Sequence, residues 1–416
     1  MIKPIIYPCV IAGKKRSFAS AVRAGDFVFL SGETGTNPET GRVRVEAVGV
    51  QTFDLLDKVK DSLERAGTSL DNIVRIDIHF IAAGGIDFWE GPCTMDYFKI
   101  NAPKLAENMP SATDCGVPNL CSPEELIELT IIAAMPEAKT KYYPFEYGGV
   151  TKSDYSKKQT FSRANVVGDF VFPSGQSGRL PETGRVRNLS TAVQAVDALN
   201  KIKTNLEIAG TSLENIIRID YWFVGKEGAT LWEGPVMDYF RKNAPKLAED
   251  MPAVCPHGLK SLCYPEQHVE FCVIAVLPEA EAKVKTYPCY YGDKKQNFAS
   301  AVKVGDFVFL SSDSGRVTDT GRVRGLSPAV QAVDALDNIK TNLEKVGTSL
   351  ENIVKIDYYF VGNIGELLWE GPVMDYFRKN APSLAENMPA VGRCGLQNLY
   401  YPEELVQLDV IAVMPS

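Results

Sequence analysis

The sequence has few of the features that mark membrane, zinc-binding or nucleic-acid-binding proteins. No apolar run reaches the roughly 18 residues of a membrane span. The chain has three histidines and nine cysteines, without a Cys-x-x-Cys pair or a Cys/His cluster at zinc spacing. Basic residues are outnumbered, since 44 Lys and Arg stand against 52 Asp and Glu, for a net charge of −8. This balance argues against a nucleic acid or an anionic membrane as the main partner.

The cysteines and the first residues predict a cytoplasmic protein. An odd, scattered set of cysteines is typical of reduced thiols. The first apolar stretch ends at Pro8 and is followed by Lys14–Arg16, unlike a signal peptide. With 416 residues, of which 45% are apolar and 23% charged, the chain has enough material for several buried cores. We expect no metal and no cofactor.

One unit is written three times along the chain. Three motifs recur at offsets of 143 and then 137 residues: Asp-Phe-Val-Phe from Asp26, Asp169 and Asp306, Thr-Gly-Arg-Val-Arg from Thr40, Thr183 and Thr320, and Trp-Glu-Gly-Pro from Trp89, Trp232 and Trp369. A period near 140 residues is the size of a domain rather than of a solenoid repeat. We therefore predict three repeats, with boundaries at residues 1–139, 140–282 and 283–416.

Each repeat is predicted to be a small α+β unit of about four strands and two helices. In the first copy the expected elements are strands at Phe27–Ser31, Thr40–Val45, Ile73–Phe80 and Ile127–Ala134, and helices at Glu46–Ala66 and Trp89–Asn108, the second interrupted at Pro103. Gly67 stands where a helix C-terminus favours glycine. In Ile73–Phe80 the apolar residues alternate with Arg75, Asp77 and His79, which predicts a strand with one wet face.

Three units in one chain suggest a closed ring with pseudo-threefold symmetry. Head-to-tail contacts close a ring when the rotation between neighbours allows it. Fusion removes the concentration dependence of assembly and lets the three interfaces diverge. We expect a monomeric pseudo-trimer, with further association into a homo-oligomer left open.

The order of the motifs resembles the RidA/YjgF family of enamine/imine deaminases. The resemblance covers each copy and is carried in the first by Phe18-Ala19-Ser20, Gly25-Asp26-Phe27, Leu30-Ser31-Gly32, Met109-Pro110 and the strand Glu128–Ala133, and in the second by Phe170–Gln176. It implies chorismate-mutase-like units with a ligand cleft at each of three interfaces. The reaction it implies is hydrolysis of a small enamine or imine to a keto acid and ammonia. Fusion of unequal copies favours an enzyme of a dedicated pathway over a general scavenger of imines.

The resemblance also implies a set of site residues. An arginine that holds the substrate carboxylate matches Arg393, and its equivalents in the other copies are Asp114 and Pro256. A glutamate that helps to activate water matches Glu128 and Glu270. The third copy has Gln407 at that position.

Further candidates lie next to these positions. The residues after the arginine position, which are candidates for acid–base or nucleophilic roles, are Cys115, His257 and Cys394. The cleft-lining positions are the aromatics Phe18, Phe161 and Phe298 and the pairs Ser31-Gly32, Ser174-Gly175 and Ser311-Ser312.

No single copy contains both the arginine and the glutamate. If a cleft takes both residues from one subunit, none of the three clefts is complete. The copies differ most around Asp114, Pro256 and Arg393, which suggests three unequal sites. Our hypothesis is one working cleft built around Arg393, with the other two repurposed or silent.

Structural interpretations stand beside these functional ones. The cysteines suit small buried side chains, Glu128 and Glu270 suit the wet face of a strand, and the Ser-Gly pairs suit a tight turn. Trp-Glu-Gly-Pro suits a structural motif in which Gly-Pro shapes a helix start.

Other functions remain open at this point. They are a non-catalytic small-molecule-binding pseudoenzyme, a cyclic-amide ring-opening enzyme of the cyanuric acid hydrolase type using Ser31, Ser174 or Ser311, and RNA cleavage, which the acidic charge disfavours.

Overall fold

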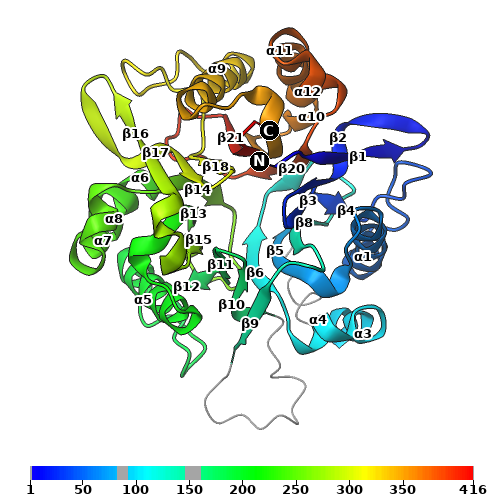
Figure 1. Ribbon diagram of the computed structural model, residues 1–416, viewed down its shortest axis with the longest axis horizontal. Helices are drawn as coiled ribbons and strands as arrows, with labels where there is room; N and C mark the ends of the chain where they lie inside the picture. Colours follow the sequence, from blue (N-terminus) through cyan, green and yellow to red (C-terminus); the bar gives the residue numbers. More distant parts are fainter. Residues whose placement is uncertain (1, 82–91, 146–160, 416) are drawn as a thin grey trace.

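The computed structural model describes residues 2–81, 92–145 and 161–415. Three α+β units surround a common centre, with their strands inside and their long helices at the periphery (Figure 1). The ring expected from the repeats is therefore present. The first Trp-Glu-Gly-Pro motif begins at Trp89, which lies outside the described residues.

Repeat 1 supplies one six-stranded layer and its helices. Its elements are β1 (Ile5–Ile11), β2 (Lys14–Ala24), β3 (Phe27–Leu30), β4 (Glu33–Thr34), α1 (Val48–Arg65), β5 (Ile73–Phe80), α3 (Pro92–Asn101), α4 (Pro103–Glu107), β6 (Ser111–Gly116), β7 (Asn119–Leu120) and β8 (Ile127–Ala134). The strand order is β6-β5-β8-β3-β2-β1, and only the β5–β6 pair is parallel.

Repeat 2 has the same layer in the order β14-β13-β15-β11-β10-β9. Its elements are β9 (Thr140–Pro144), β10 (Ser162–Val167), β11 (Phe170–Pro173), β12 (Gln176–Ser177), α5 (Thr191–Ala209), β13 (Ile216–Val224), α6 (Gly228–Leu231), η4 (Trp232–Val236), α7 (Met237–Asn243), α8 (Pro245–Glu249), β14 (Ala253–Leu259) and β15 (Val269–Val276).

Repeat 3 follows in the order β20-β19-β21-β18-β17-β16. Its elements are β16 (Val284–Tyr291), β17 (Lys294–Val304), β18 (Phe307–Leu310), α9 (Pro328–Val346), α10 (Gly365–Leu368), η7 (Trp369–Val373), α11 (Met374–Asn380), α12 (Pro382–Glu386), β20 (Ala390–Leu396) and β21 (Val406–Val413). Short 3-10 turns at Leu70–Asn72, Leu213–Asn215 and Leu350–Asn352 lead into the central strands, and another spans Pro278–Lys283.

Each repeat buries its own core between its sheet and its long helix. The helix predicted at Glu46–Ala66 is present as α1, and its residues Leu55, Val59 and Leu63 are fully buried against the sheet. Gly67 follows the helix with φ +86°, a left-handed conformation that glycine adopts without a Cβ clash. No helix in the described ranges is long and apolar enough to cross a membrane.

A fourth apolar cluster lies where the three repeats meet. Phe27, Phe170 and Phe307, one from each repeat, pack edge to face with ring centroids 5.5 to 5.6 Å apart. Edge-to-face packing is a favoured arrangement of aromatic rings. This triad gives the ring a shared hydrophobic core.

The predicted wet face of Ile73–Phe80 is wrong. Arg75 and His79 are 5% and 3% exposed, because this face looks into the ring and not into solvent. Arg75 pairs with Asp77 at 2.9 Å and with Asp220 of repeat 2 at 3.0 Å. An alternating strand pattern shows that one face is polar but not that it meets water, since a neighbouring repeat can supply the partner charge.

The Gly-Pro of Trp-Glu-Gly-Pro starts a helix in repeat 3, where the backbone is kinked at Gly371 (φ −96°, ψ −105°) and Pro372 begins the helix after the kink. In repeat 2 it does not. Pro235 lies inside a continuous helical segment, in a π-helical turn between α6 and α7. The tryptophan joins neighbouring repeats: Trp232 Nε1 donates to Asn297 O at 3.1 Å, and Trp369 Nε1 donates to Ser17 Oγ at 3.0 Å. The motif therefore has a structural role, which is to connect neighbouring repeats through its tryptophan.

Candidate functional site: three unequal clefts between repeats

The serine of each Ser-Gly or Ser-Ser pair fastens one repeat to the next. Ser31 Oγ donates to Ala19 O at 2.5 Å and accepts from Val391 N of repeat 3 at 2.7 Å. The other two serines repeat the pattern: Ser174 bonds Ser162 O and Ala112 N, and Ser311 bonds Ala299 O and Val254 N. All three are buried. We call these contacts the serine clasps.

The strand register makes the three arginine-position residues equivalent. In each repeat this residue pairs with the equivalent position of the central strand: Asp114 with Ile78, Pro256 with Tyr221 and Arg393 with Tyr358. Glu128, Glu270 and Gln407 are equivalent in the same way, opposite His79, Trp222 and Tyr359. The correspondence predicted from the sequence is thus confirmed in space.

Arg393 and Glu128 meet in one cleft although they belong to different repeats. Arg393 lies on β20 of repeat 3 and Glu128 on β8 of repeat 1, and Arg393 N donates to Glu128 Oε1 at 3.3 Å. Both line a cavity of about 500 Å³ together with Phe18 and Gly32. We call this cavity the Arg393 cleft. The absence of an arginine–glutamate pair within any one copy does not leave this cleft incomplete, because the interface supplies the pair.

The Arg393 guanidinium is held by two neighbours. It stacks 4.9 Å from the centroid of the Phe18 ring, and Nη1 is 2.7 Å from Glu366 Oε2. Its side chain is 11% exposed, whereas that of Glu366 is 45% exposed. Arg16 Nη2 lies 3.6 Å from the other Glu366 oxygen. The guanidinium is therefore held in one orientation, while its partner Glu366 is exposed enough for a ligand carboxylate to replace it.

Burial changes the acidity of Glu128. The side chain is almost completely enclosed, and burial, helped by the nearby Glu125, raises the pKa of Glu128 to about 8 although Arg393 lowers it in part. Gly32 leaves room for the carboxyl group, since a Cβ there would lie 2.4 Å from Glu128 Oε1. At neutral pH this group is mostly a carboxylic acid, which can donate a proton.

The equivalent cavity between repeats 1 and 2 has a different lining. It measures about 90 Å³ and is lined by Asp114 of repeat 1 and by Phe161, Arg179, Lys201 and Glu270 of repeat 2, among others. We call it the Lys201 cleft. Thr113 Oγ1 donates to Glu270 Oε1 at 3.2 Å, and burial raises the pKa of Glu270 to about 7 while Lys201 opposes that shift.

The third interface carries bulky side chains at the corresponding positions. Where the Arg393 cleft has Cys121 and Ser122, repeat 3 has Tyr400 and Tyr401, and Arg316 lies 4.9 Å from the Tyr401 ring centroid. Arg316 also pairs with Glu404. We call this region the Tyr400 interface. The equivalents of Arg393 and Glu128 here are Pro256 and Gln407, and both are buried.

Phe298, the third predicted aromatic, also belongs to the Tyr400 interface. It packs against the core of repeat 2, as Phe18 packs against the core of repeat 3. Tyr291 lies edge-on to it, with ring centroids 6.2 Å apart.

Three predicted site residues lie away from these cavities. Cys115, His257 and Cys394 are 0 to 1% exposed, and burial raises the pKa of both thiols well above the usual range. His257 Nε2 lies 3.0 Å from Asp409 Oδ2, and the imidazole stacks on Trp222 at 4.0 Å. These positions correct the predicted nucleophilic or acid–base roles, because the next residue along a strand faces the opposite side.

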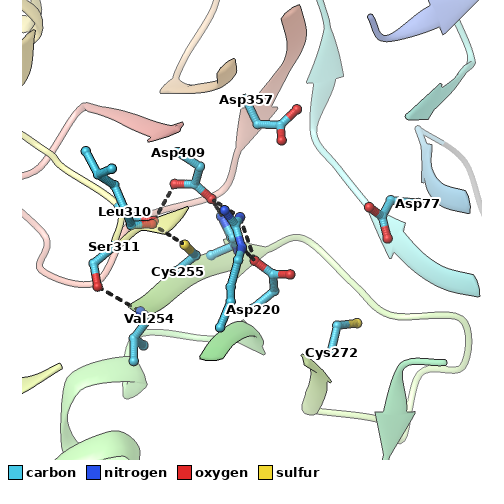
Figure 2. A network of polar contacts seen from close by, with 12 residues as sticks. Asp77, Asp220, Val254, Cys255, Cys272, Leu310, Ser311, Asp357 and Asp409 are labelled. Carbon is cyan, nitrogen blue, oxygen red and sulfur yellow. Dashed lines mark hydrogen bonds and ion pairs between the residues drawn. The ribbon is translucent and has the colours of Figure 1, made fainter. Parts of the chain in front are cut away.

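A group of possible metal ligands lies in the ring interior, around Asp220, Cys255 and Asp409. The carboxylates are already engaged by Arg218, which is 2.8 Å from Asp220 Oδ1 and 3.2 Å from Asp409 Oδ2. Burial alone would raise the pKa of Asp220, but Arg218 and Arg75 lower it to about 2. Figure 2 shows the Cys255 thiol turned toward the carbonyl of Leu310, to which it donates. The donor set fits an internal ion-pair network rather than a cation site.

Sequence reasoning missed several residues that line the two open clefts. They are Glu33, Lys58, Glu125, Glu366, Arg179 and Lys201. The available signal was a comparison between copies, because Lys58, Lys201 and Asn338 are equivalent, and so are Glu33, Gln176 and Asp313. The joint replacement of a basic residue and its acidic partner from one repeat to the next is visible only when the three repeats are aligned.

Comparison with known proteins accounts for all three repeats. The family model described as Endoribonuclease L-PSP matches residues 13–135, 151–277 and 293–413. The chain belongs to the RidA/YjgF family. The exact boundaries between its repeats, placed here at 139/140 and 282/283, stay a prediction.

Individual relatives match shorter stretches. RutC family proteins of Pyrococcus abyssi and Aquifex aeolicus are 31% and 39% identical over 62 residues, which is 15% of this chain and 49% of each relative. The chain thus spans about half the length of the curated relatives it matches. A YjgF family structure from Neisseria meningitidis shares 21% identity, with 33% of this chain and 98% of that chain covered and a TM-score of 0.26. A chorismatase structure shares 13% identity, with 82% and 93% covered and a TM-score of 0.47.

Proposed function

We propose that this RidA/YjgF family protein hydrolyses a small carboxylate-bearing enamine or imine in the Arg393 cleft, releasing a keto acid and ammonia. The observation that carries the proposal is the meeting of Arg393 and Glu128, from two repeats, at the wall of one cavity. We further propose that the enzyme acts in a dedicated pathway, since one of its three interfaces, as far as the described residues show, presents this pair. The scattered reduced cysteines favour the cytoplasm as its location.

Arg393 is suited to hold the substrate carboxylate. A planar guanidinium binds a carboxylate through two parallel hydrogen bonds. In the structure Glu366 occupies this partner position at 2.7 Å. When a ligand carboxylate replaces it, Arg16 remains beside Glu366 as an alternative partner. The Phe18 ring keeps the guanidinium plane oriented during the exchange.

Glu128 is suited to move the proton. As an acid with a pKa of about 8, it donates to the enamine carbon or the imine nitrogen. The resulting carboxylate takes a proton from the water that attacks the imine carbon. A C–O bond forms, and Glu128 returns that proton to the nitrogen of the carbinolamine. The C–N bond then breaks, ammonia leaves, and the hydroxyl proton passes to Glu128 as the carbonyl forms. The sum is one water consumed for each ammonia and keto acid released.

The ring-opening alternative is poorly supported by the geometry. Ser31, Ser174 and Ser311 each already donate one hydrogen bond and accept another in a clasp. A buried hydroxyl used in this way is not presented to a substrate carbonyl. RNA cleavage is disfavoured by the net charge of −8.

A coupled assay tests the proposal. An amino-acid oxidase generates the imine, and release of the keto acid is timed with the chain, with Arg393→Gln, with Glu128→Gln and without protein. We expect acceleration by the wild-type chain that both variants lose. No acceleration of any imine would favour a binding protein, and acceleration kept in both variants would place the reaction elsewhere.

A further inference from the structure

The Lys201 cleft contains two cations that lack the carboxylates found beside their equivalents. Its cavity lies between β6 of repeat 1 and the wall formed by β12 and α5 of repeat 2. The equivalent residues of repeats 1 and 3 show which partners each position has at the other interfaces of the chain.

Lys201 is the first of these cations. Its equivalent in repeat 1, Lys58, is 3.0 Å from Glu33 Oε2. In repeat 3 the equivalent Asn338 donates to Asp313 Oδ1 at 3.0 Å. In repeat 2 the carboxylate position is Gln176, whose amide donates to Ser174 O instead. Among the described residues Lys201 has no ion pair within 4 Å, and burial lowers its pKa to about 8.

Arg179 is the second cation. Its equivalent Arg316 pairs with Glu404. In repeat 2 that acid is replaced by Gln267, which bonds Ser177 Oγ and Tyr264 N. Arg179 stacks 3.8 Å from the Tyr264 ring centroid, and its Nε donates to Gly184 O. Both acid-to-amide differences therefore remove negative charge from the wall of one cavity.

The side of the cavity formed by β6 and β15 carries carboxyl groups, of which Glu270 is close enough to Lys201 for each to shift the pKa of the other. Asp114 stands where the Arg393 cleft has its arginine, and Glu270 stands beside it, bonded to Thr113 and to the Asp114 backbone. Compared with the Arg393 cleft, the charge on this side is reversed. A ligand carboxylate is repelled here and attracted to the wall that bears Lys201 and Arg179.

We propose that the Lys201 cleft is a second binding site, for a small amino-carboxylate whose carboxylate lies between Lys201 and Arg179 and whose nitrogen lies toward Glu270 and Asp114. The ligand is thus oriented opposite to one held by Arg393. This site does not depend on the reaction proposed for the Arg393 cleft.

Ligand-observed NMR titration of the full chain tests the site with three probes of similar size. β-Alanine has both groups, propionate has only the carboxylate, and ethylamine has only the amine. We expect β-alanine to bind most tightly. Gln176→Glu, which restores the carboxylate present in repeat 1, should weaken β-alanine binding about tenfold, and Lys201→Gln should weaken it similarly. Gln296→Glu adds the same charge on β17, at a half-buried position that does not line this cavity, and should change the affinity less than about twofold.

The outcomes separate this site from the Arg393 cleft. Arg393→Gln should slow hydrolysis of a carboxylate-bearing imine in the coupled assay but leave the β-alanine affinity sensitive to Gln176→Glu. Melting temperatures close to wild type would show that Gln176→Glu and Lys201→Gln are folded. The proposal is overturned if neither variant changes the affinity, if ethylamine binds as well as β-alanine, or if no probe shows saturable binding.

Discussion

The Arg393 cleft and the Tyr400 interface occupy equivalent places in the ring, but the first encloses a cavity and the second carries bulky side chains at the matching positions. Both are closed by a serine clasp, through Ser31 in one and Ser311 in the other. The first holds a cavity in which the buried acid Glu128 accepts from the backbone N–H of Arg393. The second carries two tyrosines and a paired arginine at the matching positions.

The comparison shows that assembly and chemistry depend on different residues of the same interface. The clasp serines directly follow β3, β11 and β18 and bond a strand of the neighbouring repeat, and all three copies keep them. The cleft residues lie beside the clasps, and each copy has changed them. Fusion of three subunits permits this divergence, because each interface of the ring is encoded separately.

The largest effect is expected from Glu128→Gln. Loss of a positioned acid typically reduces a rate by about 10² to 10⁴-fold, and the amide cannot donate a proton in the same way. We expect kcat/KM for imine hydrolysis to fall within that range. The control is Glu137→Gln, an exposed glutamate of the same repeat, which should leave kcat/KM unchanged. A fall of less than threefold in Glu128→Gln would place proton transfer on another group.

Arg393→Gln should have the next largest effect. A hydrogen bond to a charged group is worth about 1.5–3 kcal/mol, which corresponds to roughly 10- to 150-fold in binding. We expect this loss mainly in KM for carboxylate-bearing substrates. Imines without a carboxylate should react equally well with both proteins. An equal loss for the two substrate classes would contradict the anchoring role.

The pH dependence should follow the acid form of Glu128. Because burial raises the pKa of Glu128 to about 8, the group is protonated below that pH and loses its proton above it. The protein-dependent kcat/KM should therefore be flat below pH 8 and fall about tenfold per unit above it. The spontaneous hydrolysis measured without protein is subtracted at each pH. A rate that rises through pH 8 would indicate that the carboxylate starts the reaction.

The serine clasps should have the smallest effect, and the same one at each interface. Ser31→Ala leaves the buried Val391 N–H and Ala19 carbonyl without this partner, at a cost of about 1–3 kcal/mol in the free energy of unfolding. Ser174→Ala and Ser311→Ala should cost similar amounts in urea denaturation. A large loss at one interface alone would show that the clasps, like the clefts, have diverged.

The sequence predicted the repeats, the α+β unit and the ring because these depend on periodicity within one chain. The helix ending at Gly67 and the equivalence of Asp114, Pro256 and Arg393 follow from the same local signals. The pairing of Arg393 with Glu128 could not be predicted, because it depends on which strands of neighbouring repeats face each other.

The errors have the same physical origin. Arg75 and His79 were expected in water because a strand pattern does not reveal a neighbouring repeat. His257 and Cys394 were expected in the cleft, whereas the alternation of a strand turns them to its other side. In each case the neighbouring repeat, and not the local sequence, decides the environment of the side chain.

A crystal structure of the full chain soaked with pyruvate tests the central claim that the three clefts are unequal. The account predicts the pyruvate carboxylate on Arg393 in the Arg393 cleft, with Glu366 displaced. In the Lys201 cleft any bound carboxylate should face Lys201 and Arg179 and not Asp114. The Tyr400 interface should stay without ligand. Pyruvate bound with equal occupancy and the same orientation at all three interfaces would contradict the account.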